Sequence, residues 1–391
     1  MSSSDVVIVG AARTPIGRLL GGLSSLKATE LGSWAIRGAL GGIDPGVVDA
    51  VIMGQVLQAG VGQNPAKQAA LGAGISPRAH TVTVNKVCLS GLSAVIDAAR
   101  LLRSGEAGVV VAGGMESMSN APHLQLGSRR GTRYGTITMA DHLALDGLTD
   151  ADAGISMGEL SEQHAQRYPA TREEQDSVAA TSHANAHAAW EKGVMQREVI
   201  PVTITTRKGD TVVDRDEGIR PESTAKVLGG LRPAFTGDGS ITAGNSSPIS
   251  DGAAATVLTT RERAGDEGWE ILATVRAPGQ VAGPDSSLQE QPANALRVAL
   301  DRQGWGVEEL DLVEINEAFA AVSVHSTRVL GIDPVKVNPH GGAVALGHPI
   351  GASGARLVVH AVHCINAGEI GRAGVALCGG GGQGEALLLE G

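Results

Sequence analysis

The sequence predicts an α/β protein, and three observations indicate this class. Apolar runs that end in a glycine, such as residues 5–10, are typical of strands buried on both faces of a sheet. Segments such as residues 90–103 place apolar side chains three and four positions apart, which is the helical spacing. Aromatic residues make up only 2% of the chain, so the core must consist of Val, Ile, Leu and Ala. Strands that alternate with helices form a sheet covered by helices on both faces.

The first third of the chain alternates regularly. Strands are expected at residues 5–10, 49–55, 81–85 and 109–111, and helices at residues 29–40, 63–73 and 90–103. Asn64-Pro65 places a proline in the first turn of the second helix, where its missing N–H costs no hydrogen bond. Residues 11–17 are expected to form a turn-rich loop.

The pattern changes between about residue 115 and residue 250. A polar, alanine-rich helix is expected at residues 172–192 and a short strand at residues 199–205. Basic residues gather in this part: Arg129, Arg130, Arg133, Arg207, Lys208, Arg220, Lys226 and Arg232. We interpret it as a loop-and-helix insertion into the α/β body, whose strand pattern resumes at Ala253.

The last third repeats the first in outline. Strands are expected at residues 271–277, 310–315, 374–378 and 386–389, and helices at residues 292–303, 317–330 and 354–366. Ser90-Gly91 and Ser353-Gly354 each open a helix that leads to a strand ending in two glycines, which indicates two similar halves facing each other. The expected division is residues 1–117 with 251–268 as one half, 118–250 as the inserted loop domain, and 269–391 as the other half.

Charge and cysteine usage exclude several classes of protein. The formal net charge of −10 argues against nucleic acid as a partner. The three cysteines have neither the spacing of a zinc site nor the density of a disulfide scaffold, which suits a reducing compartment. We expect no signal peptide, no transmembrane helix and no Ser-Lys-Leu peroxisomal signal, and therefore a cytoplasmic protein.

Cys378 ends a strand-like run and is followed by Gly379-Gly380-Gly381-Gly382. Bare N–H groups beside a reactive sulfur suit an oxyanion or a thioester carbonyl. The alternative is a glycine-rich hairpin with an inert cysteine, and this stretch alone does not decide between the two.

Three further residues carry chemistry. Cys88 lies between a strand and the start of a helix, where the helix dipole lowers a thiol's pKa; the alternative is a small buried hydrophobe. His348 stands in a small apolar loop and needs a partner, either a thiolate or a backbone carbonyl. Asn316 follows a strand and can hold a water or carbonyl oxygen, or cap a helix. Cys364 is interpreted as a packing residue, and the other histidines receive no role.

Taken together, these stretches resemble the thiolases over essentially the whole chain. Asn85-Lys-Val-Cys-Leu-Ser-Gly-Leu is similar to the nucleophilic-cysteine motif of that family. Asn316-Glu-Ala-Phe-Ala, Gly347-His-Pro-Ile-Gly-Ala-Ser-Gly and Cys378-Gly-Gly-Gly-Gly-Gln-Gly resemble the other three active-site motifs, in the family's order. The resemblance implies the thiolase fold, with two similar α/β halves in a layered αβαβα core and an inserted loop domain. It is closest to the short-chain acetyl-CoA acetyltransferases.

The resemblance also implies a mechanism. Cys88 would carry the acyl group, His348 would take its proton, and Cys378 would remove the α-proton of a second acetyl-CoA, giving acetoacetyl-CoA and CoA. His348 with a water on Asn316 would form one oxyanion site, and the N–H groups of Cys88 and Gly380 the other. Coenzyme A thioesters would be the substrates, and no metal or organic cofactor would be required.

Substrate contacts follow from the same resemblance. Arg220 would face the adenine and phosphate end of coenzyme A, while Ser247, Ala318 and Phe319 would line the pantetheine tunnel. Met157 would form a wall of the acyl pocket, and Leu288 would lie near the reacting acyl group. Residues 125–139 resemble the loop through which family tetramers, as dimers of dimers, assemble.

The sequence departs from the family pattern at two places. Ser156 precedes Met157-Gly158 where the family often has His, which removes a possible contact to coenzyme A. The second departure is a loop that reads Leu288-Gln-Glu-Gln-Pro-Ala-Asn-Ala here, where the family commonly has Met-Gly-x-Gly-Pro-x-Pro-Ala. Because two glycines of the family pattern are missing, this loop should be stiffer.

Three other activities stay open at this point. The nearest is a broad-specificity 3-ketoacyl-CoA thiolase of fatty-acid β-oxidation. A decarboxylating condensing enzyme of the ketoacyl synthase type shares the fold but has no second active-site cysteine. A non-catalytic acyl-CoA-binding relative should have lost the nucleophile or the base, and this chain keeps both.

Overall fold

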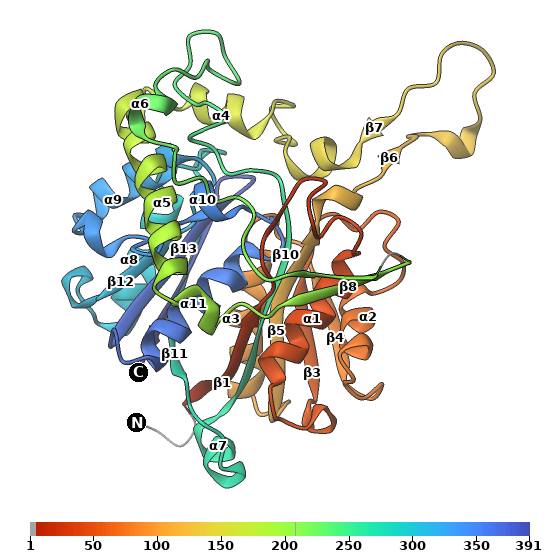
Figure 1. The fold of residues 1–391 in the computed structure, drawn as a ribbon, viewed down its shortest axis with the longest axis vertical. Coiled ribbons are helices and arrows are strands. Elements are labelled where there is room, and N and C mark those ends of the chain that lie inside the picture. The colour runs from red at the N-terminus through yellow and green to blue at the C-terminus, as the bar shows by residue number, and fades with distance from the viewer. Residues whose placement is uncertain (1–4, 208) are drawn as a thin grey trace.

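Two groups of strands form the central sheet in the computed structural model, which describes residues 5–207 and 209–391 (Figure 1). The N-terminal group is β1 (Val6–Arg13), β2 (Gly17–Arg18), β3 (Ala50–Gly54), β4 (His80–Val84), β5 (Val109–Ser117) and β10 (Ser250–Thr260). The C-terminal group is β11 (Ala273–Ala282), β12 (Leu312–Ile315), β13 (Arg372–Gly379) and β14 (Gln383–Glu390).

The strand order is β12-β13-β14-β11-β1-β10-β5-β3-β4, with β2 beside β10. The two groups meet where β1 pairs with β11, and this junction has only two residue pairs, Val7 with Thr274 and Ile8 with Ala273. Within each group the pairing is much longer; β5 and β10, for example, pair from Asp251 with Ser117 to Thr259 with Val109. The sheet therefore divides naturally into the two halves that the sequence repeat predicts.

Helices form three layers around and between these strands. The outer faces are covered by α1 (Ala28–Leu40) and α2 (Pro65–Gly72) on the N-terminal half, and by α8 (Gln291–Gln303) and α9 (Ala320–Leu330) on the C-terminal half. The middle layer is α3 (Ser90–Arg103) with α11 (Ser353–Asn366), which pack against each other and against strands of both halves. The predicted αβαβα layering is confirmed.

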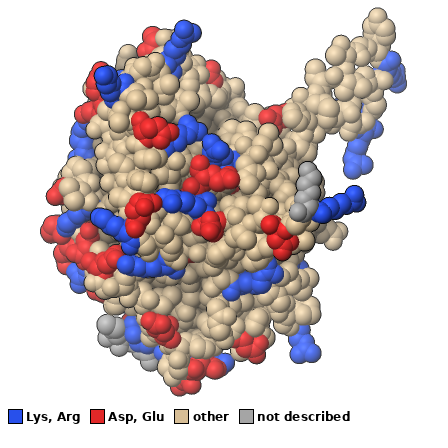
Figure 2. Space-filling view, in the orientation of Figure 1, with Lys and Arg blue, Asp and Glu red and all other residues tan. Residues whose placement is uncertain are grey.

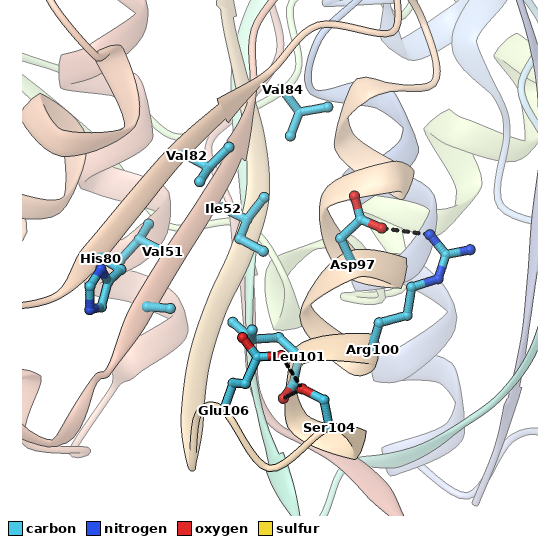
Figure 3. A pocket seen from close by; sticks show the side chains of 11 residues that line it. Val51, Ile52, His80, Val82, Val84, Asp97, Arg100, Leu101, Ser104 and Glu106 are labelled. Carbon is cyan, nitrogen blue, oxygen red and sulfur yellow. Dashed lines mark hydrogen bonds and ion pairs between the residues drawn. The ribbon is translucent and has the colours of Figure 1, made fainter.

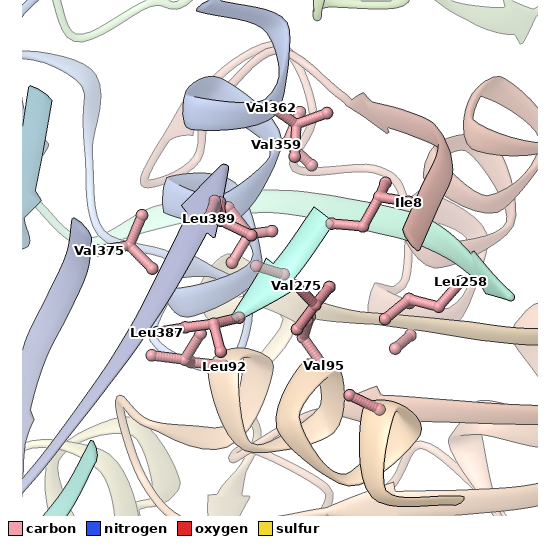
Figure 4. Close-up of a cluster of buried hydrophobic side chains, with 14 of the residues drawn as sticks. Ile8, Leu92, Val95, Leu258, Val275, Val359, Val362, Val375, Leu387 and Leu389 are labelled. Carbon is pink, nitrogen blue, oxygen red and sulfur yellow. The ribbon is translucent and has the colours of Figure 1, made fainter. Parts of the chain in front are cut away.

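The middle layer contains the largest hydrophobic core. Leu92 and Val95 of α3 and Val359 and Val362 of α11 are fully buried among strand residues from both halves (Figure 4). The strand side chains drawn there include Ile8, Leu258, Val275, Val375, Leu387 and Leu389. Each such side chain contributes about 1.5–3 kcal/mol of transfer free energy, so this layer holds the two halves in a fixed relation.

Small residues let the two central helices begin against each other. A Cβ added to Gly91 would lie 2.8 Å from the backbone N of Ala355, and one added to Gly354 would lie 2.5 Å from the backbone N of Leu92. Both distances are shorter than real Cβ contacts allow, so the close approach requires glycine. The Ser-Gly pairs noticed in the sequence thus start two helices that meet in the middle of the molecule.

The segment between β5 and β10 contains most of the other described helices and strands. They are β6 (His123–Leu124), β7 (Ala140–Asp141), α4 (Met157–Gln163), α5 (Arg172–Glu191), β8 (Val202–Thr206), β9 (Gly209–Val213) and α6 (Ala225–Leu228). The chain between β6 and β7 projects from the body as a long arm (Figure 1), and basic side chains stand out on it (Figure 2). Two short helices lie outside this segment, α7 (Arg261–Glu267) and α10 (Ala343–Leu346). The expected domain boundaries stay a prediction.

Two expectations about elements were wrong. Residues 11–13 continue β1 instead of forming a loop, because Arg13 pairs with Ala254 and its buried guanidinium binds Glu198 and Asp216 at 2.6 and 2.7 Å. Helix α9 begins at Ala320, three residues later than expected, because the backbone N–H of Ala320 donates to the carbonyl of Asn245.

Candidate active site

The loop between β4 and α3 holds Cys88 in a strained turn. Val87 has φ of +51°, in the left-handed region that a β-branched residue rarely adopts. The turn is fixed by Ser90, whose Oγ accepts the N–H of Lys86 at 2.8 Å and donates to the carbonyl of Val87 at 2.6 Å. A strained strand-to-helix turn of this kind presents a nucleophile to the space above a sheet.

The Cys88 thiol lies against backbone N–H groups of two loops. Hydrogen bonds from its own N–H and from that of Gly380 favour the thiolate, yet burial outweighs them and raises the pKa of Cys88 to about 11. The nearby carboxylate of Glu116 raises it further. The lowering expected at the helix N-terminus is therefore outweighed by burial, and the N–H groups of Cys88 and Gly380, expected to form an oxyanion site, both lie near the sulfur.

Cys378 approaches Cys88 from the other half of the molecule. It lies near the end of β13, and Gly380, Gly381 and Gly382 form the turn to β14. The Cα of Gly379 lies very close to the loop that carries Cys88. A Cβ added to Gly379 would lie 2.6 Å from Cγ of Leu89. Burial raises the pKa of Cys378, and the charge on Cys88 raises it further, so the two thiols are close enough to interact. The glycine loop is thus both a hairpin and the edge of a site.

His348 is held with one ring nitrogen bonded and the other unpartnered. Its Nδ1 lies 2.5 Å from Oγ of Ser353, and that hydroxyl is 3.0 Å from the carbonyl of Pro349. Because a carbonyl can only accept, the hydroxyl donates to Pro349 and accepts from Nδ1–H, which leaves the Nε2 lone pair free. Nε2 is buried and has no partner among the described residues. Burial lowers the pKa of His348 to about 4, so the ring is a neutral base at pH 7.

Asn316 is buried at the end of β12, and the structure excludes its role as a helix cap, since Phe319 precedes the first residue of α9. Neither Nδ2 nor Oδ1 has a hydrogen-bond partner among the described residues. An unpaired buried amide costs about 1–3 kcal/mol, so a polar group of a ligand or a water fits this position well.

Four of the predicted substrate-binding residues form one cluster with Cys378. Leu288, Ala318 and Phe319 are buried together with the thiol, and Met157 packs against them. Ser247 lies beside this cluster, with its N–H and Oγ both donating to the carbonyl of Ala318. Arg220 is the exception: it is exposed, and its backbone N–H donates to Nδ1 of His183, so no described contact brings it to the cluster.

The two departures from the family pattern have local explanations. Ser156 caps α4, since its Oγ accepts the N–H of Glu159 at 3.2 Å while the Glu159 carboxylate accepts the Ser156 N–H at 2.9 Å. Gln289, which replaces a glycine, is buried and donates from Nε2 to the carbonyl of Ser161 at 2.8 Å. This hydrogen bond restrains the loop that begins at Leu288, which was expected to be stiffer because it lacks two glycines.

The sequence interpretation missed the residues that hold the loops together. Glu116 is buried and accepts backbone N–H groups from Val56, Leu57 and Gly351, which ties the His348 loop to the N-terminal half. Lys86 reaches across to Glu385 of β14 at 2.5 Å, joining the two cysteine loops. Each acid is a charged residue within or directly after an apolar strand, and that pattern is the signal that could have found them.

A surface groove lies elsewhere. It runs between β3, the edge strand β4 and α3, and it is lined by Ile52 and Val82 of the strands and by the ion pair of Asp97 with Arg100 on the helix (Figure 3). None of the predicted catalytic residues lines it. No helix of the described chain is long and apolar enough to span a membrane.

The raised pKa of Cys88 predicts a simple pH dependence. Alkylation of this thiol by iodoacetamide should accelerate continuously from pH 7 to pH 10, because the thiolate fraction rises until the pH reaches the pKa near 11. The rate is measured by intact-protein mass. The Cys88→Ala variant gives the alkylation rate of the other two cysteines, which is subtracted from the wild-type rate. A plateau below pH 8 would show that the thiolate is already formed at neutral pH and contradict the burial argument.

Comparisons with known proteins agree with this geometry. The thiolase N-terminal domain model matches residues 6–262, and the thiolase C-terminal domain model matches residues 269–391. The chain is 54% identical over 387 residues to a probable acetyl-CoA acetyltransferase of Mycobacterium tuberculosis, covering 98% of each protein. It is 46% identical over 388 residues to an acetyl-CoA acetyltransferase of Pseudomonas aeruginosa, covering 98% of this chain and 99% of the relative.

A solved structure agrees with these relatives. The crystal structure of the Bacillus anthracis acetyl-CoA acetyltransferase superposes with a TM-score of 0.96 at 39% identity, covering 99% of this chain and 98% of that one. With both halves matched by family models and two cysteines facing each other across them, the chain belongs to the thiolase family.

Proposed function

We propose that this protein is an acetyl-CoA C-acetyltransferase, which joins two molecules of acetyl-CoA into acetoacetyl-CoA and free CoA, reversibly. The observation that carries the proposal is the convergence of Cys88, Cys378 and the Gly380 N–H from opposite halves of the molecule. The names of relatives that are 46–54% identical over nearly the whole chain support the same activity.

The first half-reaction uses Cys88 and His348. Nε2 of His348 takes the thiol proton as sulfur attacks the carbonyl of acetyl-CoA, because its lone pair is the free one. The C–S bond to coenzyme A breaks, CoA leaves as the thiol with a proton from Cys378, and an acetyl thioester remains on Cys88. The N–H groups of Cys88 and Gly380 stabilise the negative charge on the thioester oxygen.

The second half-reaction uses Cys378. Cys378 is left as a thiolate once it has given its proton to the departing CoA. The Cys378 thiolate then takes a proton from the methyl group of a second acetyl-CoA, and the enolate oxygen lies against His348 and a water on Asn316. The enolate carbon attacks the Cys88 thioester, a C–C bond forms, and Cys88 leaves as the thiolate, which regains its proton from His348.

Substrate contacts complete the proposal. Coenzyme A thioesters would enter over the inserted segment, with Ser247 and Phe319 along the pantetheine and Arg220 at the nucleotide end. The apolar cluster of Met157, Leu288 and Phe319 would hold the acyl group beside Cys378. Every step derived above uses side chains and backbone groups of this chain. The three free cysteines support a location in the reducing cytoplasm.

The nearest alternative, a broad-specificity 3-ketoacyl-CoA thiolase, differs in chain length. Leu288 and Phe319 close the pocket around Cys378. The kcat/KM for thiolysis of acetoacetyl-CoA should therefore exceed that for 3-ketohexadecanoyl-CoA by about tenfold or more. A factor of this size is typical when a pocket excludes one or two methylene groups of a substrate. The assay follows loss of the ketoacyl-CoA absorbance at equal substrate concentrations. A clear preference for the long chain would favour the β-oxidation activity instead.

Two surfaces support the proposal of a homo-oligomer. The edge strand β4 leaves Val82 55% exposed, and an unpaired edge of this kind favours pairing with a second copy. The arm between β6 and β7 carries the exposed apolar residues Leu126, Tyr134, Ile137 and Met139, in keeping with the tetramer loop that the sequence predicts.

This assembly can be tested by light scattering coupled to size exclusion. The wild-type chain should run as a tetramer, and deletion of residues 127–137 should leave dimers, because it removes the arm but not β4. Val82→Lys should weaken the dimer, since a charge on the edge strand opposes pairing. A wild-type chain that is monomeric at micromolar concentration would contradict the proposal, as would a truncated chain that remains tetrameric.

A further inference from the structure

A cluster of three potential metal ligands lies away from the candidate active site. His360 and Cys364 are one turn apart on α11, and His340 comes from the loop before α10. Nδ1 of His340 lies 3.1 Å from Nε2 of His360, and Sγ of Cys364 lies 3.8 and 3.7 Å from these two nitrogens. The sequence interpretation gave His340 and His360 no role and treated Cys364 as packing.

These distances suit one tetrahedral ion. Zinc bonds of about 2.0–2.1 Å to nitrogen and about 2.3 Å to sulfur, at the tetrahedral angle, separate two nitrogen ligands by about 3.3 Å and nitrogen from sulfur by about 3.6 Å. The three distances in the structure differ from these values by only a few tenths of an ångström. An imidazole pair with a thiolate is a donor set that zinc prefers.

The surroundings of His360 orient it as a ligand. Its Nδ1 lies 2.8 Å from Oε2 of Glu198, and Glu198 is itself held by the guanidinium of Arg13. A carboxylate that accepts the Nδ1 proton leaves the Nε2 lone pair directed into the cluster, as in the carboxylate–histidine–metal arrangement of many metal sites.

A carboxylate lies on the His360 side of the cluster. Oε1 of Glu314, on β12, is buried without a hydrogen-bond partner among the described residues, and it lies 4.0 Å from Nε2 of His360. The other oxygen, Oε2, accepts from Nη1 of Arg356 at 2.8 Å, which fixes the carboxylate beside the cluster. His360 and Cys364 are buried, whereas His340 is only half-buried and gives the site its route to solvent.

We propose that His340, His360 and Cys364 bind one Zn²⁺ ion, whose fourth position faces the half-buried His340 side. The ion would join two parts of the molecule: the loop that leads to His348 and the central helix α11 that begins at Ser353. Its role would be structural. The ion would stabilise the loop that carries His348 and would take no part in the chemistry at Cys88 and Cys378.

The test uses the full chain without an affinity tag, stripped by a chelator, reloaded with Zn²⁺ and desalted. Metal content by mass spectrometry should be one zinc per wild-type chain, and the melting temperature should rise on loading. Cys364→Ser and His340→Ala should bind zinc at least about tenfold more weakly, because each removes a ligand. His363→Gln, on the same helix but outside the cluster, should bind as the wild type does.

A second measurement separates this site from the catalytic thiols and does not depend on the ligand variants folding. The chain has three cysteines, so in the double variant Cys88→Ala/Cys378→Ala the only thiol is Cys364. Cobalt(II) added to this variant should give a thiolate-to-cobalt charge-transfer band. The absence of that band would overturn the proposal, and so would zinc uptake by the wild type no greater than that of Cys364→Ser. In that case the cluster is a hydrogen-bonded His–His–Cys network without a metal.

Discussion

Replacing Cys88 by alanine is expected to abolish both acetylation of the protein and thiolysis of acetoacetyl-CoA. The Cys88 sulfur is the only one to which both the Cys88 and the Gly380 N–H groups are directed, so no other thiol can form a stabilised acyl-enzyme. Loss of a covalent nucleophile costs about 10⁴–10⁶-fold in kcat. Intact-protein mass after incubation with acetyl-CoA, which should show no added acetyl group, checks the first part, and the thiolysis rate checks the second.

The control for this variant is His363→Gln, which keeps all three thiols and should still be acetylated. Circular dichroism before the assay shows whether each variant is folded. An acetyl group retained by folded Cys88→Ala at the wild-type level would refute Cys88 as the acyl carrier.

Replacing Cys378 by alanine is expected to separate the two half-reactions. Acetylation of Cys88 should persist, because His348 rather than Cys378 accepts its proton, whereas condensation should fall by about 10²–10⁴-fold, the value of a general acid–base group. The condensation rate is followed as release of CoA, and the acetyl-enzyme is followed by mass on the same sample.

Cys378→Ser is the matched variant for this experiment, since it keeps the volume and a hydrogen-bond donor but replaces the thiol by a far weaker acid. It should acetylate normally and condense as poorly as the alanine variant. Condensation by Cys378→Ala at the wild-type rate would remove this residue from the mechanism.

Most of the fold could be predicted from the sequence, because its strands and helices have strong periodicity. The predicted helix at residues 90–103 is α3 without an error at either end, and the Ser-Gly repeat indicated the packing of α3 on α11. The failures lie where tertiary contacts decide. Residues 11–13 carry no strand pattern of their own, and buried ion pairs of Arg13 with Glu198 and Asp216, 185 and 203 positions away, keep them in β1.

The residues of the candidate site can be proposed from sequence motifs, whereas their electrostatics cannot. Cys88, His348, Cys378 and Asn316 stand in local motifs that can be read from a few neighbouring residues. The pKa of Cys88 depends instead on how much of the molecule surrounds the thiol, and burial there outweighs the helix N-terminus. Glu116 and Glu385 escaped notice for the same reason, since their partners come from distant segments.

The most direct test of the two-thiol account is to locate the acetyl group in the wild-type protein. The enzyme is incubated with acetyl-CoA, quenched in acid, digested with pepsin and mapped by tandem mass spectrometry. The account predicts the acetyl group on the peptide that contains Cys88, with the thiols of Cys364 and Cys378 unmodified. An acetyl group found on Cys378, or on neither catalytic cysteine, would contradict it.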